Sequence, residues 1–203
     1  MKIGIVNQGI GNVGSVHSAL AFYGYNVIFV NKPSDLKDIS VIVLAGVGNF
    51  PTAVSRLERS KLWDKINEEV LVKKKPVIGI CLGMQLFADV SYEGGKHRGF
   101  GWIKGKVVKL NGDNLKLPHM GWNKVDASDA VLFGGMRYNF FYFMHSYHFV
   151  PEDDRVIVAT TNYGDAKIIS AVRQNNIAGV QFHPEMSQAD GLRLLRNMVE
   201  VVR

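Results

Sequence analysis

Cysteine is almost absent from this sequence, since Cys81 is the one cysteine among 203 residues. A disulfide within the chain is therefore impossible, and a cysteine-rich metal site is excluded. A lone cysteine is commonly a small buried hydrophobe. A chemical role for Cys81 therefore has to come from the residues around it.

Long apolar runs are also lacking. No apolar stretch reaches the ~20 residues that a helix needs to span a bilayer. The apolar start of the chain, residues 1–6, is too short for a signal peptide and predicts a buried first strand instead. We therefore expect a cytoplasmic protein, with no membrane among its partners.

Neither sign of charge is concentrated in one segment. The formal net charge is +6, and the densest basic run is only three residues long, at 73–75. We interpret that run as the solvated end of a helix, so nucleic acid is not an expected partner. A basic surface could still attract an acidic protein or a phosphorylated substrate, and charge alone does not decide between them. The composition, 47% hydrophobic and 21% charged, indicates a globular protein.

The first half of the chain alternates apolar strands with helices. Apolar residues at helical spacing predict helices over 13–23 and 51–75. The predicted strands are continuously apolar, which is typical of a parallel sheet covered on both faces. These strands span residues 2–7, 26–30, 41–44 and 76–80.

The second half has closely spaced strands and one closing helix, predicted over 191–202. Turn-forming residues at 111–114 and 174–176 predict hairpin turns. One α/β domain over residues 1–203, with a mixed sheet in its C-terminal half, accounts for the whole pattern. The predicted strands of this half span residues 107–110, 140–143, 156–160, 168–172 and 177–182.

Cys81 lies in a glycine-flanked turn between a predicted strand and a helical segment. Gly79 and Gly83 stand two residues before and after it, which is the pattern of a nucleophile elbow. Glycine removes the steric clash that this tight turn creates. The thiol would project over a helix N-terminus, where the helix dipole favours a thiolate and the N–H of Leu82 can serve an oxyanion hole. A plain glycine-rich turn with a buried thiol remains the alternative.

A candidate base for that thiol lies a hundred residues later. Gln181 and His183 alternate along the end of a predicted strand, so their side chains share one face. Pro184 ends the strand, and Glu185 can fold back to accept a hydrogen bond from the imidazole, as the acid of a triad does. Taken without Cys81, a His-Pro-Glu turn is more often part of the protein surface than of a reactive site.

The remaining histidines do not form a metal site. His145 and His148 are three residues apart on a predicted strand and would face opposite sides. We therefore expect neither a metal nor a cofactor.

Together these motifs resemble class I (triad) glutamine amidotransferases, on the residues 79–85 and 183–185. More narrowly, the chain resembles the HisH family, the glutaminase subunits of imidazole glycerol phosphate synthases. The resemblance runs from the first strand to the last helix and implies a flavodoxin-like fold with a central, mostly parallel sheet flanked by helices. The segments that carry it are residues 12–15, 46–50, 117–123, 145–147 and 187–197.

The resemblance implies a covalent mechanism. Cys81 would attack the side-chain amide carbon of glutamine, and His183 would activate the thiol and protonate the leaving ammonia. Glu185 would orient His183, and water would hydrolyse the glutamyl thioester. The substrate would be held by Gly46, Gly48, Gln85 and Ser146, and the oxyanion hole would use Val47 and Leu82.

The resemblance also implies a partner, a (β/α)8 cyclase subunit of the HisF type in a heterodimer. Ammonia would pass to that cyclase for synthesis of imidazole glycerol phosphate and aminoimidazole carboxamide ribotide in histidine biosynthesis. Met120, Trp122 and Asn123 match interface positions. For Trp122 the alternative is a place in the hydrophobic core.

Two positions depart from the family pattern. Ala45 stands where proline is usual, which changes the restraint on the oxyanion segment, and Met186 stands where a partner-facing lysine is usual. These departures keep open a paralogue that supplies ammonia to a synthase of acetamidino groups on surface sugars. A more distant alternative is a non-catalytic scaffold or thiol sensor on the same fold.

Overall fold

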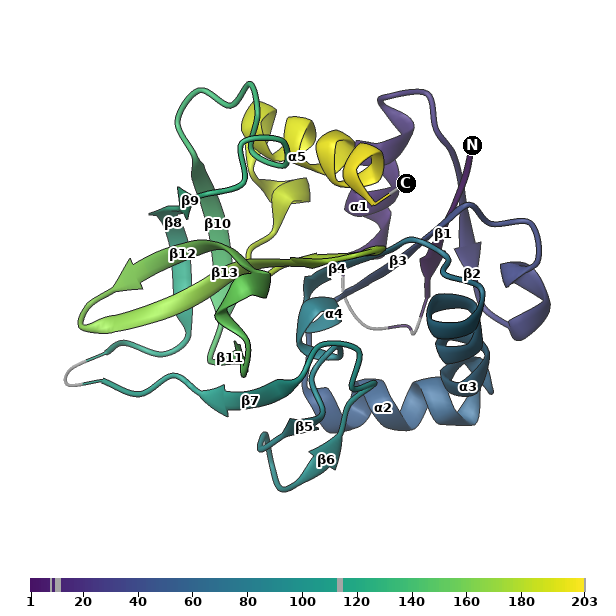
Figure 1. The fold of residues 1–203 in the computed structure, drawn as a ribbon, viewed down its shortest axis with the longest axis horizontal. Coiled ribbons are helices and arrows are strands. Elements are labelled where there is room, and N and C mark those ends of the chain that lie inside the picture. The colour runs from purple at the N-terminus through teal and green to yellow at the C-terminus, as the bar shows by residue number, and fades with distance from the viewer. Residues whose placement is uncertain (8, 10–11, 113–114, 203) are drawn as a thin grey trace.

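The computed structural model describes residues 1–203 except 8, 10, 11, 113, 114 and 203. A central sheet is covered on one face by α1 (Val13–Ala21) and α5 (Gln188–Val201). The helices α2 (Phe50–Arg59) and α3 (Leu62–Asn67), with the short α4 (Leu82–Gln85), lie on its other face (Figure 1). Over the described residues, no helix is both long and apolar enough to cross a membrane.

The main sheet has eight strands in the order β2-β1-β3-β4-β14-β13-β12-β9. They are β1 (Lys2–Val6), β2 (Asn26–Val30), β3 (Val41–Gly46), β4 (Val77–Cys81), β9 (Asp126–Ala127), β12 (Ile157–Tyr163), β13 (Ala166–Gln174) and β14 (Ile177–Val180). The pairs from β2 to β14 are parallel and those from β14 to β9 are antiparallel. The predicted mixed sheet is therefore confirmed.

The parallel pair of β14 with β4 decides where the chain leaves the sheet. Val180 pairs with Ile80 at the carboxyl end of both strands. Cys81 is the next residue on β4, and residues 181–183 continue from β14 beside it. Two segments a hundred residues apart in sequence thus leave the sheet at the same edge, where parallel α/β sheets commonly present their reactive groups.

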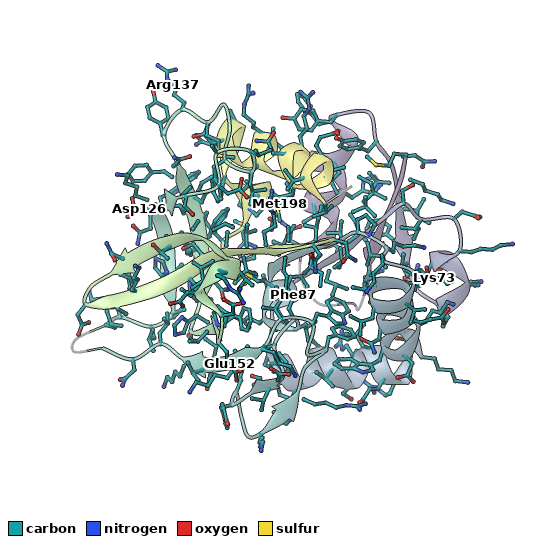
Figure 2. All side chains as sticks on the ribbon, in the orientation of Figure 1. Lys73, Phe87, Asp126, Arg137, Glu152 and Met198 are labelled. Atoms are coloured by element: carbon teal, nitrogen blue, oxygen red, sulfur yellow. The ribbon has the colours of Figure 1, made fainter. Side chains whose placement is uncertain are left out.

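The apolar core is split by the sheet into two layers. Met198 of α5 packs on one face and Phe87 on the other, both with no exposed side chain (Figure 2). Each fully buried side chain of this kind stabilises the fold by roughly 1.5–3 kcal/mol. The layer under α1 and α5 includes Ile3, Ile5, Leu20, Leu194 and Leu195, and the layer under α2 and α3 includes Val6, Leu44, Leu57, Trp63 and Ile66.

Two smaller sheets lie beside the C-terminal half. The first pairs β8 (His119–Lys124) with β10 (Phe140–His145), and the second has the order β11-β7-β5-β6. The strands of the second sheet are β5 (Val90–Ser91), β6 (His97–Arg98), β7 (Gly105–Lys109) and β11 (Tyr147–Pro151).

One of the two predicted hairpin turns is present. Residues 174–176 connect β13 to its antiparallel partner β14, as predicted. The expectation of a hairpin at 111–114 was wrong, because β7 pairs with β11 and β8 pairs with β10; residues 113–114 themselves lie outside the described residues. These pairings join strands far apart in sequence, which local turn residues cannot indicate.

The single helix predicted over 51–75 was also wrong. The chain breaks at Lys61, whose φ is +59°, and continues as α3 and then as a π-helical turn, η2 (Glu68–Val72). Shorter 3₁₀ turns occur at η1 (Pro33–Leu36), η3 (Asp154–Val156) and η4 (Pro184–Met186).

The basic run at 73–75 ends a helical segment, and Lys73 and Lys74 are exposed as interpreted, but Lys75 is half-buried. The carboxylate of Glu69 in η2 is buried and is shared by three lysines. Lys73 and Lys75 each lie 2.7 Å from it and Lys65 lies 3.2 Å from it. Burial alone would raise the pKa of Glu69, but the hydrogen bonds from Lys73, Lys75 and Lys65 lower it to about 2. This ion cluster fixes the end of the helical segment ahead of β4.

We expect Glu69→Gln to lower the free energy of unfolding by about 1–3 kcal/mol at neutral pH, because the mostly buried Lys75 loses its charged partner while the exposed lysines are screened. The folded-state pKa of Glu69 is depressed, so its contribution is present above about pH 4.5 and is lost as the pH falls toward about 2. Denaturant unfolding of both proteins across that range should show the difference shrinking. A difference that stays constant would contradict this role of Glu69.

Candidate active site

Cys81 occupies a strained turn at the end of β4. Its φ is +55° and its ψ is −110°, an uncommon backbone conformation for a residue other than glycine. A Cβ added at Gly83 would collide with the carbonyl of Leu44, and one at Gly79 would lie 2.7 Å from the backbone nitrogen of Met84. Both glycines are therefore required by close packing, and the predicted strand–turn–helix elbow is present.

His183 and Glu185 form a buried pair directly after β14. The two side chains are 2% and 3% exposed, and His183 Nδ1 lies 2.9 Å from Glu185 Oε1. Because a carboxylate oxygen only accepts, Nδ1 carries the proton of this hydrogen bond. The backbone of His183 is held by Tyr142 and Ser187, through bonds of 2.8 and 2.6 Å. The imidazole is thereby fixed with its other nitrogen, Nε2, available.

The thiol and the imidazole lie at the same edge of the sheet. Nε2 of His183 is buried, and no group of the described chain makes a well-aligned hydrogen bond to it. Burial would lower the pKa of His183, but the charge of Cys81 and the hydrogen-bonded carboxylate of Glu185 raise it to about 10. The imidazole is thus placed to take the thiol proton and to be stabilised as an imidazolium.

A cavity of about 210 Å³ opens beside Cys81. It is bordered by the elbow and α4 on one side and by the junction of β10 and β11 on the other. Several predicted site residues line it together with residues not predicted. Its lining residues are Val47, Gly48, Cys81, Leu82, Gln85, Glu93, Pro118, Met144, His145, Ser146 and Tyr147.

Gly46 takes a different position from the other predicted substrate residues. It pairs with Cys81 across β3 and β4 and lines a small apolar cavity with Ala45 and Leu82 instead of the larger one. Its backbone therefore lies next to the nucleophile, while the neighbouring Val47 and Gly48 face the cavity.

The predicted interface residues lie apart from the cavity, on β8. The side chains of Met120 and Trp122 are 57% and 48% exposed, so Trp122 is not a core residue. Asn123 is half-buried, and its amide nitrogen donates to the carbonyl of Asn162 at 3.0 Å. The three residues share a strand but not the reactive site.

Gln181 is the main functional candidate that sequence reasoning did not assign. Its side chain is fully buried, and its Nε2 lies 3.6 Å from Cys81 Sγ. The alternation that placed it on the same face as His183 is confirmed, and that alternation was the available signal. His145 and Glu93 also line the cavity without having been singled out. No cluster of potential metal ligands occurs within the part of the chain that the structure describes.

Comparisons with known proteins agree with this geometry. The family model "Glutamine amidotransferase class-I" matches residues 5–201. "Imidazole glycerol phosphate synthase subunit HisH" of Pyrococcus furiosus is 45% identical over 200 residues, covering 97% of each chain. The protein of the same description from Pelagibacter ubique is 38% identical over 209 residues, covering 99% of this chain and 100% of the other.

A solved structure described as a glutamine amidotransferase superposes with a TM-score of 0.79 and covers 98% of both chains. At 19% identity, that similarity bears on the fold alone. The family match over nearly the whole chain and the closely similar relatives establish the family: this chain belongs to the class-I glutamine amidotransferases.

Proposed function

We propose that the chain hydrolyses glutamine to glutamate and ammonia, with Cys81 as nucleophile, His183 as base and acid, and Glu185 as its orienting carboxylate. The observation that carries this proposal is the strained Cys81 beside a buried imidazole whose Nδ1 is held by a carboxylate. Membership in the amidotransferase family and the HisH relatives support glutamine as the substrate.

The reaction follows from the positions of the three groups. His183 Nε2 takes the thiol proton, and the thiolate attacks the side-chain amide carbon of glutamine. The N–H groups of Leu82 and Val47 stabilise the oxyanion of the tetrahedral intermediate. The imidazolium then protonates the leaving nitrogen, and ammonia departs as the thioester forms. A water molecule that gives its proton to His183 cleaves the thioester and releases glutamate.

Gln85 has a defined role in holding the substrate. Its Nε2 donates to the carbonyl of Tyr147 at 2.8 Å and to Gln181 Oε1 at 3.1 Å, so both amide hydrogens are used. The amide can then offer only its oxygen to a molecule in the cavity. That oxygen suits a donor such as the ammonium group of an amino acid, and the hydroxyl of Ser146 and the backbone at Gly48 complete the binding surface.

The ammonia is passed to a partner subunit in this proposal. The similar relatives are described as subunits of imidazole glycerol phosphate synthase, so the partner proposed here is a HisF-type (β/α)8 cyclase in a heterodimer. Several large apolar side chains are exposed near one another, and a contiguous apolar patch of this kind often marks an interaction site. This docking face comprises Met120, Trp122, Tyr138, Phe140 and Met186, each at least 41% exposed.

The docking face is hollowed as well as apolar. A cavity of about 370 Å³ lies between Trp122, Tyr138, Phe140 and the start of α5. Aromatic side chains around such a hollow are typical anchors of protein interfaces. We further propose that residues 1–203 act as one amidotransferase domain in the cytoplasm.

Cys81→Ala should reduce glutamate release by at least ~10³-fold in the presence of the cyclase and its acceptor, because no other residue can form the thioester. Glutamate release is measured with an enzyme-coupled assay, with and without the partner. Wild-type protein alone should show little activity and strong stimulation by the loaded complex. Glutaminase activity retained in Cys81→Ala would contradict the covalent mechanism, and full wild-type hydrolysis without the partner and its acceptor would contradict the expected stimulation by the loaded complex.

Glu185→Gln should lower kcat by on the order of 10²-fold, because the neutral amide no longer stabilises the imidazolium. The carboxylate helps to hold the pKa of His183 above its ordinary value. Without it the thiolate–imidazolium pair forms over a narrower range, so the acid limb of the pH–rate curve should move to higher pH and the alkaline limb to lower pH. An unshifted curve would show that Glu185 does not orient the base.

Trp122→Ala should weaken binding of the cyclase subunit by roughly tenfold or more, as loss of a central aromatic anchor does. Titration calorimetry of the two purified subunits measures the change. Phe29→Ala is a matched control, because Phe29 is also an exposed aromatic residue. It lies on β2, which is one edge strand of the main sheet, while β9 is the other edge strand. Equal losses in the two variants would place the docking face elsewhere.

A further inference from the structure

A chain of hydrogen bonds runs through the described residues with the carbonyl of Tyr147 at its centre. That oxygen accepts from His145 Nδ1 at 2.9 Å and from Gln85 Nε2 at 2.8 Å. A backbone carbonyl has two lone pairs and no proton, so both partners must be donors. This one constraint fixes the direction of every bond further along the chain.

The inner branch leads to the nucleophile. The second hydrogen on Gln85 Nε2 goes to Gln181 Oε1 at 3.1 Å, and Gln181 Nε2 then lies 3.6 Å from Cys81 Sγ. The Gln85 and Gln181 side chains are 4% and 0% exposed. If either amide were turned over, two acceptors or two donors would face each other inside the protein, at a cost on the order of 1–3 kcal/mol. The amide of Gln181 is therefore held with its donor toward the sulfur.

The outer branch leads to Asn123 on β8. Since His145 Nδ1 carries its proton, Nε2 is an acceptor, and it lies 3.1 Å from His119 Nδ1. His119 must then donate from Nδ1 and accept at Nε2, which lies 3.3 Å from the amide nitrogen of Asn123. That nitrogen also donates to the carbonyl of Asn162. The carbonyls of Tyr147 and Asn162, which accept at the two ends of this branch, require these same tautomers of His145 and His119.

The two histidines stay neutral and fixed around physiological pH. Burial lowers the pKa of His119 to about 4 and that of His145 to about 3. His119 is stacked on Tyr163, with ring centroids 4.0 Å apart, and on Phe143 at 4.6 Å. Neither protonation nor rotation interrupts the chain under those conditions.

We propose that His119, His145 and Gln181 are positioning residues, which hold the Tyr147 carbonyl, the Gln85 amide and a hydrogen-bond donor in place against Cys81 Sγ. The proposal rests on the role of Cys81 as the nucleophile. The coupling is positional: His119 and His145 fix the carbonyl, the carbonyl and Gln181 fix Gln85, and Gln181 favours the thiolate by donating to it. The outer end of the chain is Asn123 on β8, the strand that also carries Met120 and Trp122 of the docking face.

Other titratable groups also surround the sulfur. His183, supported by Glu185, approaches from the end of β14, while His145 and Glu93 line the cavity from β10 and from the segment after β5. In this proposal, the pairing of Cys81 with His183 has the larger effect on ionisation of the thiol, and the hydrogen-bond chain has the smaller one. A test must therefore compare variants that leave His183 and Glu185 unchanged.

The test is the rate at which iodoacetamide alkylates Cys81 in the purified full chain, measured across pH. Gln181→Met should lower the rate at neutral pH by about tenfold, since it removes a hydrogen bond to the thiolate. His119→Phe keeps the ring stacking, and we expect it to lower the rate by about two- to threefold, through the loss of a bond that orders the chain. Both variants should shift the alkylation midpoint to higher pH.

The matched control is His148→Phe. His148 is half-buried, its pKa is also lowered to about 4 by burial, and no bond of this chain includes it. The double variant His119→Phe/Gln181→Met should be slowed about as much as Gln181→Met alone, because the two residues act through one chain. Should His119→Phe lose its cooperative melting transition, Asn123→Leu tests the same branch at a half-buried position, with a two- to threefold loss expected.

If the reductions in alkylation rate of the two single variants multiply in the double variant, the proposal is overturned. It is also overturned if the pH profile of alkylation in His119→Phe or Asn123→Leu equals that in His148→Phe. Alkylation needs neither glutamine nor a partner. If the protein shows the expected coupling in alkylation but releases no glutamate, the proposed function is refuted and these positioning roles remain. If glutamate release depends on Cys81 but the alkylation rates show no coupling between His119 and Gln181, the positioning roles are refuted and the proposed function remains.

Discussion

The parallel pairing of β14 with β4 is the constraint on which the rest of the site depends. It brings Val180 beside Ile80, so Cys81 and His183 leave the sheet at one edge although they are a hundred residues apart. The close approach of Gly83 to Leu44 then sets the thiol at a strained turn, and Glu185 holds the imidazole. Strain at Cys81 and burial of a charged pair are tolerated because the apolar layers on both faces of the sheet over-determine these positions.

Local features of this site follow from the sequence because they depend on neighbouring residues. Gly79 and Gly83 predicted the elbow, and strand alternation placed Gln181 with His183. The apolar strands predicted the parallel part of the sheet because both of its faces are buried. What the sequence did not show depends on distant contacts: β7 pairs with β11, and Glu69 gathers Lys65, Lys73 and Lys75 around a buried carboxylate.

Buried polar groups connect the two halves of the proposed activity. The cavity beside Cys81 and Asn123 on β8 are joined by side chains whose hydrogen bonds all donate toward the carbonyl of Tyr147. Such a network is costly to leave partly satisfied, so it specifies one arrangement of the β10–β11 junction. The hydrogen-bonded residues beside the cavity thus continue to Asn123 on β8, the strand that carries part of the proposed docking face.

The central claim is that Cys81 and His183 form one ionising pair, and the ¹⁵N chemical shifts of the His183 imidazole test it most directly. Burial lowers the pKa of His183, but the charge of Cys81 and the carboxylate of Glu185 together raise it to about 10, so the ring should be an imidazolium at neutral pH. In Cys81→Ala the same signals should titrate at clearly lower pH. A ring that is neutral at neutral pH in the wild-type protein, with a titration unchanged by loss of the thiol, would contradict the account.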